Sequence, residues 1–408
     1  MTNTHSDDGE TADWLLTPEA VRIQCHDILD RGLCGGLPNF TLDMEKLDAV
    51  AERVCATIRE TCPDLKVPPH ARWRHFMIDG EDRWSAHAMQ FDDLMERARV
   101  EFELAVTSVL LDADGGPDWR FRDEASGRIL AGSEGLALAS LGLFVSGAFS
   151  SDEAKPLRAD VNGLSRFDET TLARGFQVAD TNPLEGLAGR AALLSNVGEA
   201  VLAMPQVFGS EEPRLGNLVD YLFGHAVDGK LDARTILITL LHALGRIWSG
   251  RPHVAGRNLG DTWPHPAAGK PGLVPFHTLS QRLTYSLIEP LERAGLAVTG
   301  QEALTGLADH QNGGLFIDLG VIVPRDPSIF DHEHVPDANL VVEWRALTVG
   351  LLDAVVPLVR ESLGLNERDL SLARVLEGGT WPTGRKVAAE MREGGAPPIA
   401  IETDGSVF

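Results

Sequence analysis

The segment 133–149 (SEGLALASLGLFVSGAF) constrains the fold most, because apolar residues cover nearly every face of the helix that it predicts. A helix without a polar face must be buried, so other elements have to surround it. Ser133 stands at the position expected for its N-cap. Apolar residues at helical spacing predict further helices over 42–59, 92–111, 187–204, 215–227, 233–248, 276–294 and 338–363. We therefore expect a mainly α protein, with helices packed around a central one.

Short hairpins are expected where Asp-Gly or Ser-Gly pairs separate apolar stretches, at Asp79-Gly80, Ser126-Gly127 and Asp404-Gly405. Residues 1–17 are expected to be a disordered tail, because their first 13 residues are polar and acidic. We expect 18–408 to form one large helical domain or two lobes, an N-terminal lobe of about 18–150 and a catalytic helical region of about 184–408. The Gly- and Pro-rich stretch 249–275 is long for a loop, which favours a functional role.

The charge balance argues against polyanionic partners. The chain has 36 Lys and Arg residues and 60 Asp and Glu residues, so its net charge is −24. Such a chain repels phosphate backbones and anionic lipids, and we expect neither nucleic-acid nor membrane binding. Because the sequence shows no signal peptide and no apolar run long enough to span a bilayer, we expect a cytoplasmic protein.

Cofactor and metal motifs are absent from the sequence. It contains no G-x-G-x-x-G fingerprint, no H-E-x-x-H pair and no C-x-x-C spacing. The cluster His332-Glu333-His334 lies among acids and prolines, where a solvated loop is the simpler interpretation. We expect no cofactor and no metal.

Polar residues on an apolar helix provide the first candidate site. In PFHTLSQRLTYSL, the residues His277, Gln281 and Tyr285 follow one another at intervals of four, which places them on one helix face. Such a stripe can line a pocket. The alternative is that Gln281 and Tyr285 only bond neighbouring backbone at a helix contact. Pro290 is expected to kink or end this helix.

Asp318 lies alone in an otherwise apolar run from 315 to 323. A buried carboxylate is normally paired, protonated or used in chemistry, although a turn aspartate is the alternative. Glu343 and Arg345 are about 200° apart around a helix, so we expect one of them to enter the interior. Arg345 is our candidate partner for Asp318, and surface charge at a helix start is the alternative.

The same segments resemble the uracil-catabolism family of fungi and bacteria, a family long described as a domain of unknown function. The resemblance covers about 18–408 and is carried by several motifs, which are GSEGLALASLGLFVSGAFSSD, PLRAD, NPLEGLAGRAALL, LGDTWPHP, GLVPFHTLSQRLTYSLIEPL, NGGLFIDLGVIVPRDP, VVEWRALTVGLLD, LEGGTWPTGR and DGSVF. It implies a role in the pathway that converts uracil to its nucleotide, opens the ring and releases urea. The step that it implies is cleavage of ribosylurea or of its phosphate.

A more distant resemblance is to the queuosine-salvage N-glycosidase family, whose helical fold is like that of DNA glycosylases. Asp318 falls on the loop aspartate of that family, Gln281 on its helix glutamine, and Glu343 with Arg345 on its E-x-R pair. Leu319 and Gly320 replace the aromatic residue and the arginine that follow the family's aspartate. Contacts to the base should therefore differ, which suits a smaller, ring-opened leaving group.

This resemblance implies a catalytic role for Asp318. Cleavage of the C1′–N bond builds positive charge on the ribosyl ring, which a buried carboxylate can stabilise, or the carboxylate can deprotonate the attacking water. We expect Arg345 beside Asp318. His277, Gln281, Tyr285 and Glu343 are then candidates for binding ureide and ribose groups.

Residues of the first half of the chain are candidates for the rest of a substrate site. Arg74 in WRHF and Arg158 in PLRAD are candidate phosphate ligands, should the substrate carry a phosphate. Trp73, His75 and Trp84 are candidate pocket walls, with aromatic core packing as the alternative.

The leading hypothesis is thus an N-ribosyl hydrolase that acts without a metal on a small riboside. The alternatives are a ureide amidohydrolase that cleaves the urea group, and a non-catalytic subunit that passes intermediates between enzymes of the pathway.

Overall fold

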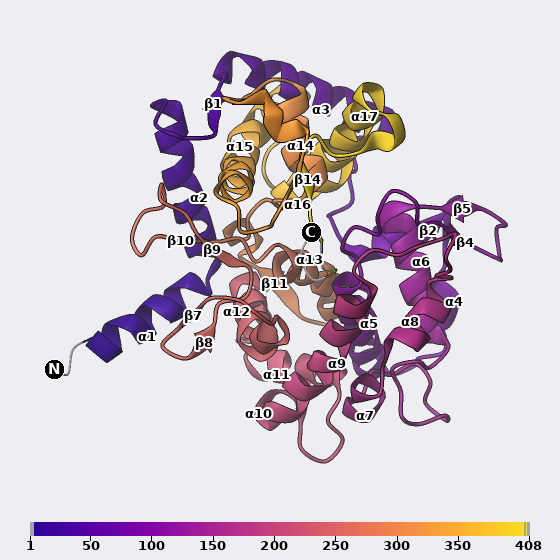
Figure 1. Cartoon of the computed structure of the whole chain (residues 1–408). Helices are drawn as coiled ribbons and strands as arrows, with labels where there is room; N and C mark the ends of the chain where they lie inside the picture. Colours follow the sequence, from indigo (N-terminus) through magenta and orange to yellow (C-terminus); the bar gives the residue numbers. More distant parts are fainter. Residues whose placement is uncertain (1–3, 404, 406–408) are drawn as a thin grey trace. The chain divides into compact units, whose positions relative to one another are not determined.

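Helices form most of the secondary structure, and the strands among the described residues occur in two-stranded pairs (Figure 1). The computed structural model describes residues 4–403 and 405. The expected mainly α fold class is confirmed. The chain divides into two compact units, each assembled from separate segments, and neither coincides with the continuous lobes 18–150 and 184–408. Unit 1 comprises Met1–His70, Arg251–Gln281 and Glu302–Glu402, and unit 2 comprises Ala71–Gly250, Arg282–Gln301 and Thr403–Phe408.

The helices of unit 1 are α1 (Thr4–Leu15), α2 (Pro18–Leu33), α3 (Leu47–Thr61), α14 (His310–Asp318), α15 (Asn339–Leu363), α16 (Leu372–Val375) and α17 (Trp381–Met391), with a π-helical turn over Leu376–Thr380. Its strands form four pairs, namely antiparallel β1 (Phe40–Leu42) with β12 (Ile322–Pro324), β7 (His253–Val254) with β8 (Arg257–Asn258), and β9 (Thr262–Pro264) with β10 (Leu273–Pro275), and parallel β13 (Glu333–His334) with β14 (Ala400–Ile401).

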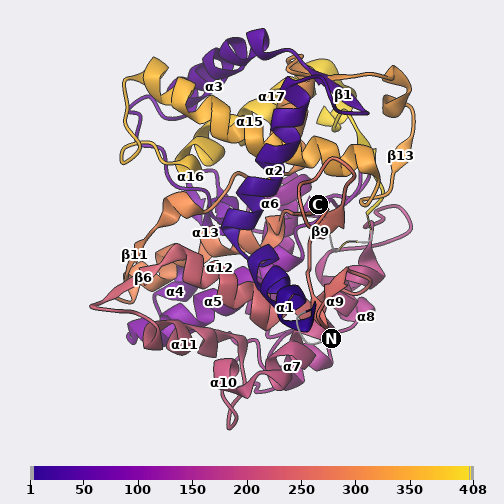
Figure 2. The same ribbon diagram turned by 90° about the vertical axis from the view of Figure 1, so that its left-hand side faces the viewer.

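Helix α15 is the centre of unit 1. It packs against α14 and against α2 and α3, which lie beside it in Figure 2. Every residue from 341 to 352 is buried. The side chain of Leu29 on α2 packs against α15 at Gly350, where a Cβ atom would lie 2.8 Å from Leu29 Cδ2. A side chain at position 350 would therefore require Leu29 to shift.

Helix α1 lies in the stretch 1–17 for which we expected a disordered tail. Its last turn carries Ala12 and Leu15, and both side chains are fully buried, as is nearly all of Leu16. The apolar end of this polar segment thus docks on unit 1 through α2 and β7, which explains why it is ordered.

The helices of unit 2 are α4 (Ser85–Ala88), α5 (Leu94–Leu110), α6 (Gly132–Val145), α7 (Val161–Ser165), α8 (Glu169–Gly175), α9 (Leu187–Ala203), α10 (Pro205–Phe208), α11 (Leu218–Gly224) and α12 (Ala233–Leu244). Its strand pairs are antiparallel β2 (Met77–Ile78) with β3 (Glu81–Asp82) and β4 (Phe121–Arg122) with β5 (Ile129–Leu130), and parallel β6 (Lys230–Asp232) with β11 (Ala297–Thr299). Helix α13 (Thr278–Arg293) begins in unit 1 and continues in unit 2.

Helix α6 is buried along most of its length, as its sequence required, and it packs against α5 and α8. The expected cap was wrong: α6 begins at Gly132, whose φ is +55°, and Ala131 is the N-cap residue. Ser133 therefore lies within the first turn, where its side chain cannot cap the helix. The chain leaves the helix at Val145 instead of continuing to 149.

Two of the three expected hairpins are confirmed, those that turn at Asp79-Gly80 and Ser126-Gly127. The return strand of the third expected hairpin, which would turn at Asp404-Gly405, lies outside the described residues, and β14 before it pairs in parallel with β13. Asp404 lies outside the described residues. Pro290 lies inside α13, which ends one turn later at Arg293.

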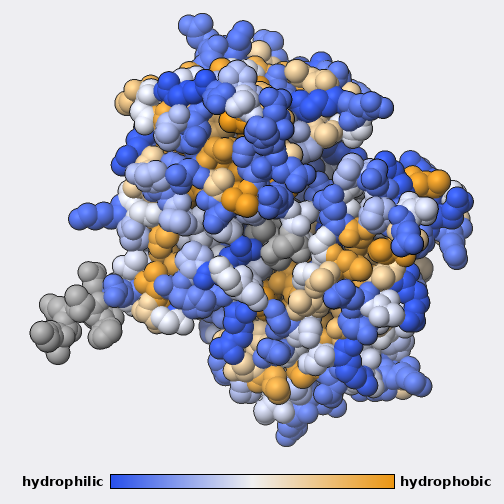
Figure 3. All heavy atoms as spheres, in the orientation of Figure 1, coloured by the Kyte–Doolittle hydropathy of each residue, from blue (hydrophilic) through white to orange (hydrophobic). Residues whose placement is uncertain are grey.

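Hydrophilic residues predominate on the face shown in Figure 3, and hydrophobic residues appear there in scattered groups. Within the described part of the chain, no helix combines the length and the apolar character needed to cross a membrane.

Candidate functional site

A buried ion pair between Asp261 and Arg345 is the centre of the polar cluster in unit 1. The two Nη atoms of Arg345 donate to the two carboxylate oxygens of Asp261 at 2.8 and 2.7 Å. The Trp263 indole N–H and the Thr278 backbone N–H donate to the same carboxylate at 2.8 and 3.1 Å. Burial opposes ionisation, but Arg345 and these donors together hold the pKa of Asp261 below its usual value. Asp261 is thus an ionised carboxylate with four donors.

Strand pairing brings Asp261 to the start of α13. Because β9 pairs with β10 in a register that places Thr262 opposite Pro275, Asp261 lies beside the residue that follows β10. The Asp261 carbonyl accepts the backbone N–H of Phe276 at 2.9 Å. The guanidinium carbon of Arg345 lies 4.0 Å from the centre of the Phe276 ring, a cation–π contact. The carboxylate also occupies a favourable place, since helix N-termini attract negative charge.

His277 is strained and keeps an acceptor atom available. Its φ is +50°, which is uncommon for a residue with a Cβ atom. The ring is buried, and Nε2 donates to the Leu15 carbonyl at 2.9 Å, which assigns the proton to Nε2. Among the described residues, Nδ1 has no hydrogen-bond partner. Since burial lowers the pKa of His277, the ring is neutral at pH 7.

Gln281 holds backbone rather than a pocket wall. Its Oε1 accepts the backbone N–H of Thr305 at 2.9 Å, and its Nε2 donates to the Thr305 hydroxyl and to the Phe276 carbonyl. Gln281 thus makes the contacts of our alternative interpretation, in which it bonds neighbouring backbone and does not line a pocket. Tyr285 is buried in unit 2, whereas His277 precedes the first turn of α13, so the three residues do not form the single helical stripe that we expected.

Glu343 and Arg345 are both buried, whereas we expected one of them to be. Two residues 200° apart can both be buried because α15 is covered on all sides along this stretch. Glu343 accepts the backbone N–H groups of Asn39 and Phe40 at 3.2 and 3.0 Å and the Asn39 amide at 2.9 Å. His265 Nε2 lies 3.6 Å from the same carboxylate. Glu343 therefore anchors the start of β1.

Asp318 pairs with Arg392 and not with Arg345, so the expected partner was wrong. Arg392 donates to both carboxylate oxygens of Asp318, at 2.8 and 2.6 Å. The Asp318 side chain is 3% exposed. Arg345 is already committed to Asp261. The pair joins the ends of α14 and α17, two helices that pack along each other.

The candidates near the first hairpin belong to unit 2. The Trp73 indole N–H donates to the Ser286 carbonyl at 2.7 Å, and Arg74 forms an ion pair with Glu289. All of these contacts are made to the part of α13 that lies in unit 2. Trp73 is 7% exposed, and the rings of Trp73 and Phe76 meet edge to face at 5.9 Å. These contacts agree with aromatic core packing, the alternative to a pocket wall.

His75 lies between two arginines. Its Nδ1 is 3.2 Å from Arg72 Nη1 and 3.3 Å from Arg282 Nη2, so Nδ1 must be the acceptor and the proton belongs on Nε2. Both arginines also pair with the buried carboxylate of Asp112. Burial, opposed by Asp112, lowers the pKa of Arg72 to about 10, and Arg282 contributes to this shift.

Sequence reasoning missed several residues of these clusters, among them Asp261, Arg392 and Asp112. Asp261 had a signal, because it lies in the motif LGDTWPHP of the Gly- and Pro-rich stretch 249–275. Arg392 and Asp112 lie in ordinary helical or turn sequence, and nothing in their neighbourhood indicates a buried partner. No group of three or more His, Cys, Asp or Glu side chains suited to a metal ion occurs within residues 4–403 and 405.

The comparisons with known proteins cover nearly the whole chain. A family described as "Protein of unknown function (DUF1688)" matches residues 14–408. The chain is 37% identical to "Protein urg3" of Schizosaccharomyces pombe, over 98% of this chain and 99% of that protein. It is 34% identical to "Uracil catabolism protein 4" of Lachancea kluyveri, over 91% of this chain and 92% of that protein.

Proposed function

The chain belongs to the DUF1688 family, and from this membership we propose that it acts in uracil catabolism as an N-ribosyl hydrolase. The proposed reaction cleaves ribosylurea, or its phosphate, to urea and ribose or ribose phosphate. The observation that supports a role in uracil catabolism is the near full-length similarity to a relative named Uracil catabolism protein 4. The hydrolytic step rests on the chemistry of the chain's own residues.

Hydrolysis of an N-riboside needs a carboxylate at the ribosyl ring. The oxygen of water bonds to C1′, the C1′–N bond breaks, and the leaving nitrogen takes up a proton. Positive charge develops on the ring as the bond breaks, and an ionised carboxylate stabilises it or removes a proton from the water. Asp318 is the proposed carboxylate.

Acceptor capacity distinguishes Asp318 from Asp261. A carboxylate offers about four lone-pair positions, and all four are used at Asp261 by Arg345, Trp263 and Thr278. Among the described residues, Asp318 accepts hydrogen bonds from Arg392 alone, one at each oxygen. Asp318 therefore has the capacity to accept a further hydrogen bond from water or a ribose hydroxyl, which supports the assignment.

Product analysis on the purified full-length chain tests the reaction. We expect synthetic ribosylurea or its phosphate to yield urea and the free sugar or sugar phosphate, with and without a chelator. Ammonia as the first product would favour a ureide amidohydrolase. Tight binding without turnover of either compound would favour a non-catalytic subunit.

The variant Asp318→Asn tests the residue. It keeps the shape of the side chain, and we expect turnover to fall by about 10²–10⁴ while the unfolding transition persists. The matched control is Asp326→Asn, a change of the same kind at an exposed cap of unit 1, where asparagine also caps well. Undiminished turnover in Asp318→Asn would remove Asp318 from the mechanism.

A further inference from the structure

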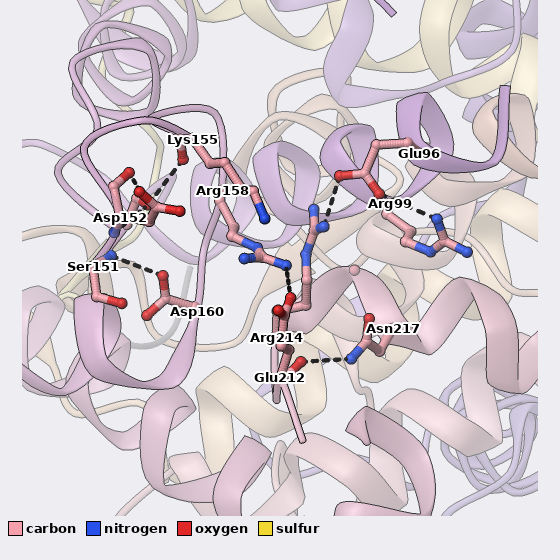
Figure 4. A network of polar contacts seen from close by, with 12 residues as sticks. Glu96, Arg99, Ser151, Asp152, Lys155, Arg158, Asp160, Glu212, Arg214 and Asn217 are labelled. Atoms are coloured by element: carbon pink, nitrogen blue, oxygen red, sulfur yellow. Dashed lines mark hydrogen bonds and ion pairs between the residues drawn. The ribbon is translucent and has the colours of Figure 1, made fainter. Parts of the chain in front are cut away.

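A loop of unit 2 presents two cations, Lys155 and Arg158, that take no part in the proposed cleavage at C1′, and Arg158 is one of the arginines that we expected to meet a phosphate on the substrate. Lys155 and Arg158 extend from this loop toward the guanidinium of Arg214 (Figure 4). Arg214 is committed to acids, because it donates to Glu103 at 2.5 and 2.9 Å and to Glu96 at 2.7 Å. Among the described residues, the Lys155 ammonium makes neither an ion pair nor a hydrogen bond.

The loop that carries these cations is held firmly. Ser150 Oγ donates to the Lys155 carbonyl at 2.9 Å and accepts the Asp152 backbone N–H at 3.1 Å. Asp160 accepts the Ser151 backbone N–H at 2.7 Å (Figure 4). These local bonds fix the backbone on both sides of Arg158, so the position of its side chain costs little further ordering.

Arg158 uses only half of its donor fork. Its Nη2 donates to Glu212 at 2.9 Å, while its Nε is buried and has no hydrogen-bond partner within the described part of the chain. The Arg158 side chain is 12% exposed. Nε–H and one Nη–H of a guanidinium point the same way and match two oxygens of one oxyanion. Glu212 occupies one of these two donors.

The Glu212 carboxylate, which is bound to the Arg158 guanidinium, lies where another anion could displace it. Its side chain is 70% exposed, and it comes from the loop between α10 and the turn that begins at Leu215. The hydrogen bond from Arg158, with the charges of Arg158, Lys155 and Arg214, lowers the pKa of Glu212. Three cations thus act on one exposed carboxylate, and an exposed ion pair of this kind contributes little stability.

We propose that Lys155 and Arg158 form a binding site for the dianionic phosphate group of a phosphate monoester, which displaces Glu212. The phosphate oxygens take both N–H groups of the Arg158 fork and approach the Lys155 ammonium. A tetrahedral dianion suits this set better than a carboxylate, since its third oxygen reaches Lys155 and its second charge balances the second cation. Inorganic phosphate and a sugar phosphate share this chemistry.

Calorimetric titration of the full-length chain with inorganic phosphate and with ribose 5-phosphate tests the site. We expect binding of both probes to weaken about tenfold or more in Arg158→Gln and severalfold in Lys155→Gln. Glu212→Gln should bind each probe more tightly, because the competing charge is gone. Arg174→Gln, which removes the same charge from an exposed position of α8, should bind as the wild type does.

The outcomes separate clearly. A purely structural Arg158–Glu212 pair would leave Glu212→Gln with unchanged or weaker binding, which overturns the proposal. Absence of binding to the wild type at millimolar concentration, or equal binding by Lys155→Gln and wild type, also overturns it. Lys155→Gln and Glu212→Gln change exposed side chains, so the test survives even if Arg158→Gln fails to fold. Tighter binding of ribose 5-phosphate than of inorganic phosphate would identify the sugar phosphate as the ligand.

Discussion

Replacing Arg345 with methionine leaves a buried charge without its cation. Methionine keeps the length of the arginine stem and its packing on α15, but it removes two charge-assisted hydrogen bonds to Asp261, a bond to the Thr278 hydroxyl at 3.0 Å and the cation–π contact with Phe276. Breaking a buried pair from one side costs about 3–5 kcal/mol. Because the Trp263 and Thr278 N–H donors remain on the carboxylate, we expect the lower end, about 3 kcal/mol.

The pH dependence of this loss has a defined sign. In the wild type the pKa of Asp261 is held below its usual value, so its contribution to stability is present above the unfolded pKa of about 3.9 and is lost as pH falls through the folded pKa. Without Arg345 the folded pKa rises, and the buried group is protonated more easily. The difference in unfolding free energy between wild type and Arg345→Met should therefore be larger at pH 8 than at pH 5.

Urea unfolding followed by far-UV circular dichroism and tryptophan fluorescence measures this difference, and coincident transitions establish that one free energy describes it. The double variant Arg345→Met/Asp261→Asn removes both charges and should be more stable than Arg345→Met alone. A loss below about 1 kcal/mol at pH 8, or a double variant no better than the single one, would refute the reasoning.

Two further predictions concern the same unit. Glu343→Gln should lower the unfolding free energy by about 1–3 kcal/mol, since a neutral amide loses charge-assisted bonds to the backbone N–H groups at the start of β1; an unchanged urea midpoint would contradict this. Burial lowers the pKa of His277, so the unfolded chain binds a proton more readily and wild-type stability should fall as pH drops below about 6.5. His277→Asn, which tolerates the positive φ, should show a smaller decrease between pH 7 and pH 5, and identical slopes would exclude this role.

Local patterns in the sequence were enough to locate the helices but not to predict the residues at which they begin and end. Apolar spacing located α3, α5, α9 and α15 to within a few residues, because each buries one face or more against its own unit. The start of α6 was misplaced because the backbone turn at Gly132 decides it, and a serine one residue later looks like a cap in sequence alone. Residues 4–15 were misjudged for a similar reason, since two buried apolar side chains at the end of a polar segment are enough to dock it.

Burial of the charged candidates could be anticipated, but their partners could not. Asp318 required a cation for physical reasons, and a cation is present. Which arginine supplies it depends on the packing of α14 against α17, and Arg392 is 74 residues away in the chain. Arg345 was the natural choice by proximity in sequence, yet the pairing of β9 with β10 brings Asp261 to it instead.

The net charge of −24 acquires a different meaning once the buried pairs are known. Inside the two units, arginines pair with buried carboxylates, as in Asp261–Arg345, Asp318–Arg392 and Glu103–Arg214. Arg345 and Arg214 are themselves buried with their carboxylates, so these two cations do not act at the surface. The surface therefore carries a net negative charge with fewer cations than the composition suggests, and anionic ligands meet repulsion at most approaches.

Salt confines that repulsion to short range, which makes the immediate neighbours of an anion site decisive. The Debye length is about 8 Å at physiological ionic strength, so distant acids contribute little to the potential at Lys155 and Arg158. Glu212, hydrogen-bonded to Arg158, is the negative charge that an incoming phosphate must replace. A gain in phosphate affinity in Glu212→Gln would thus measure direct competition at one guanidinium, because an overall charge effect would appear equally at exposed acids such as Glu169.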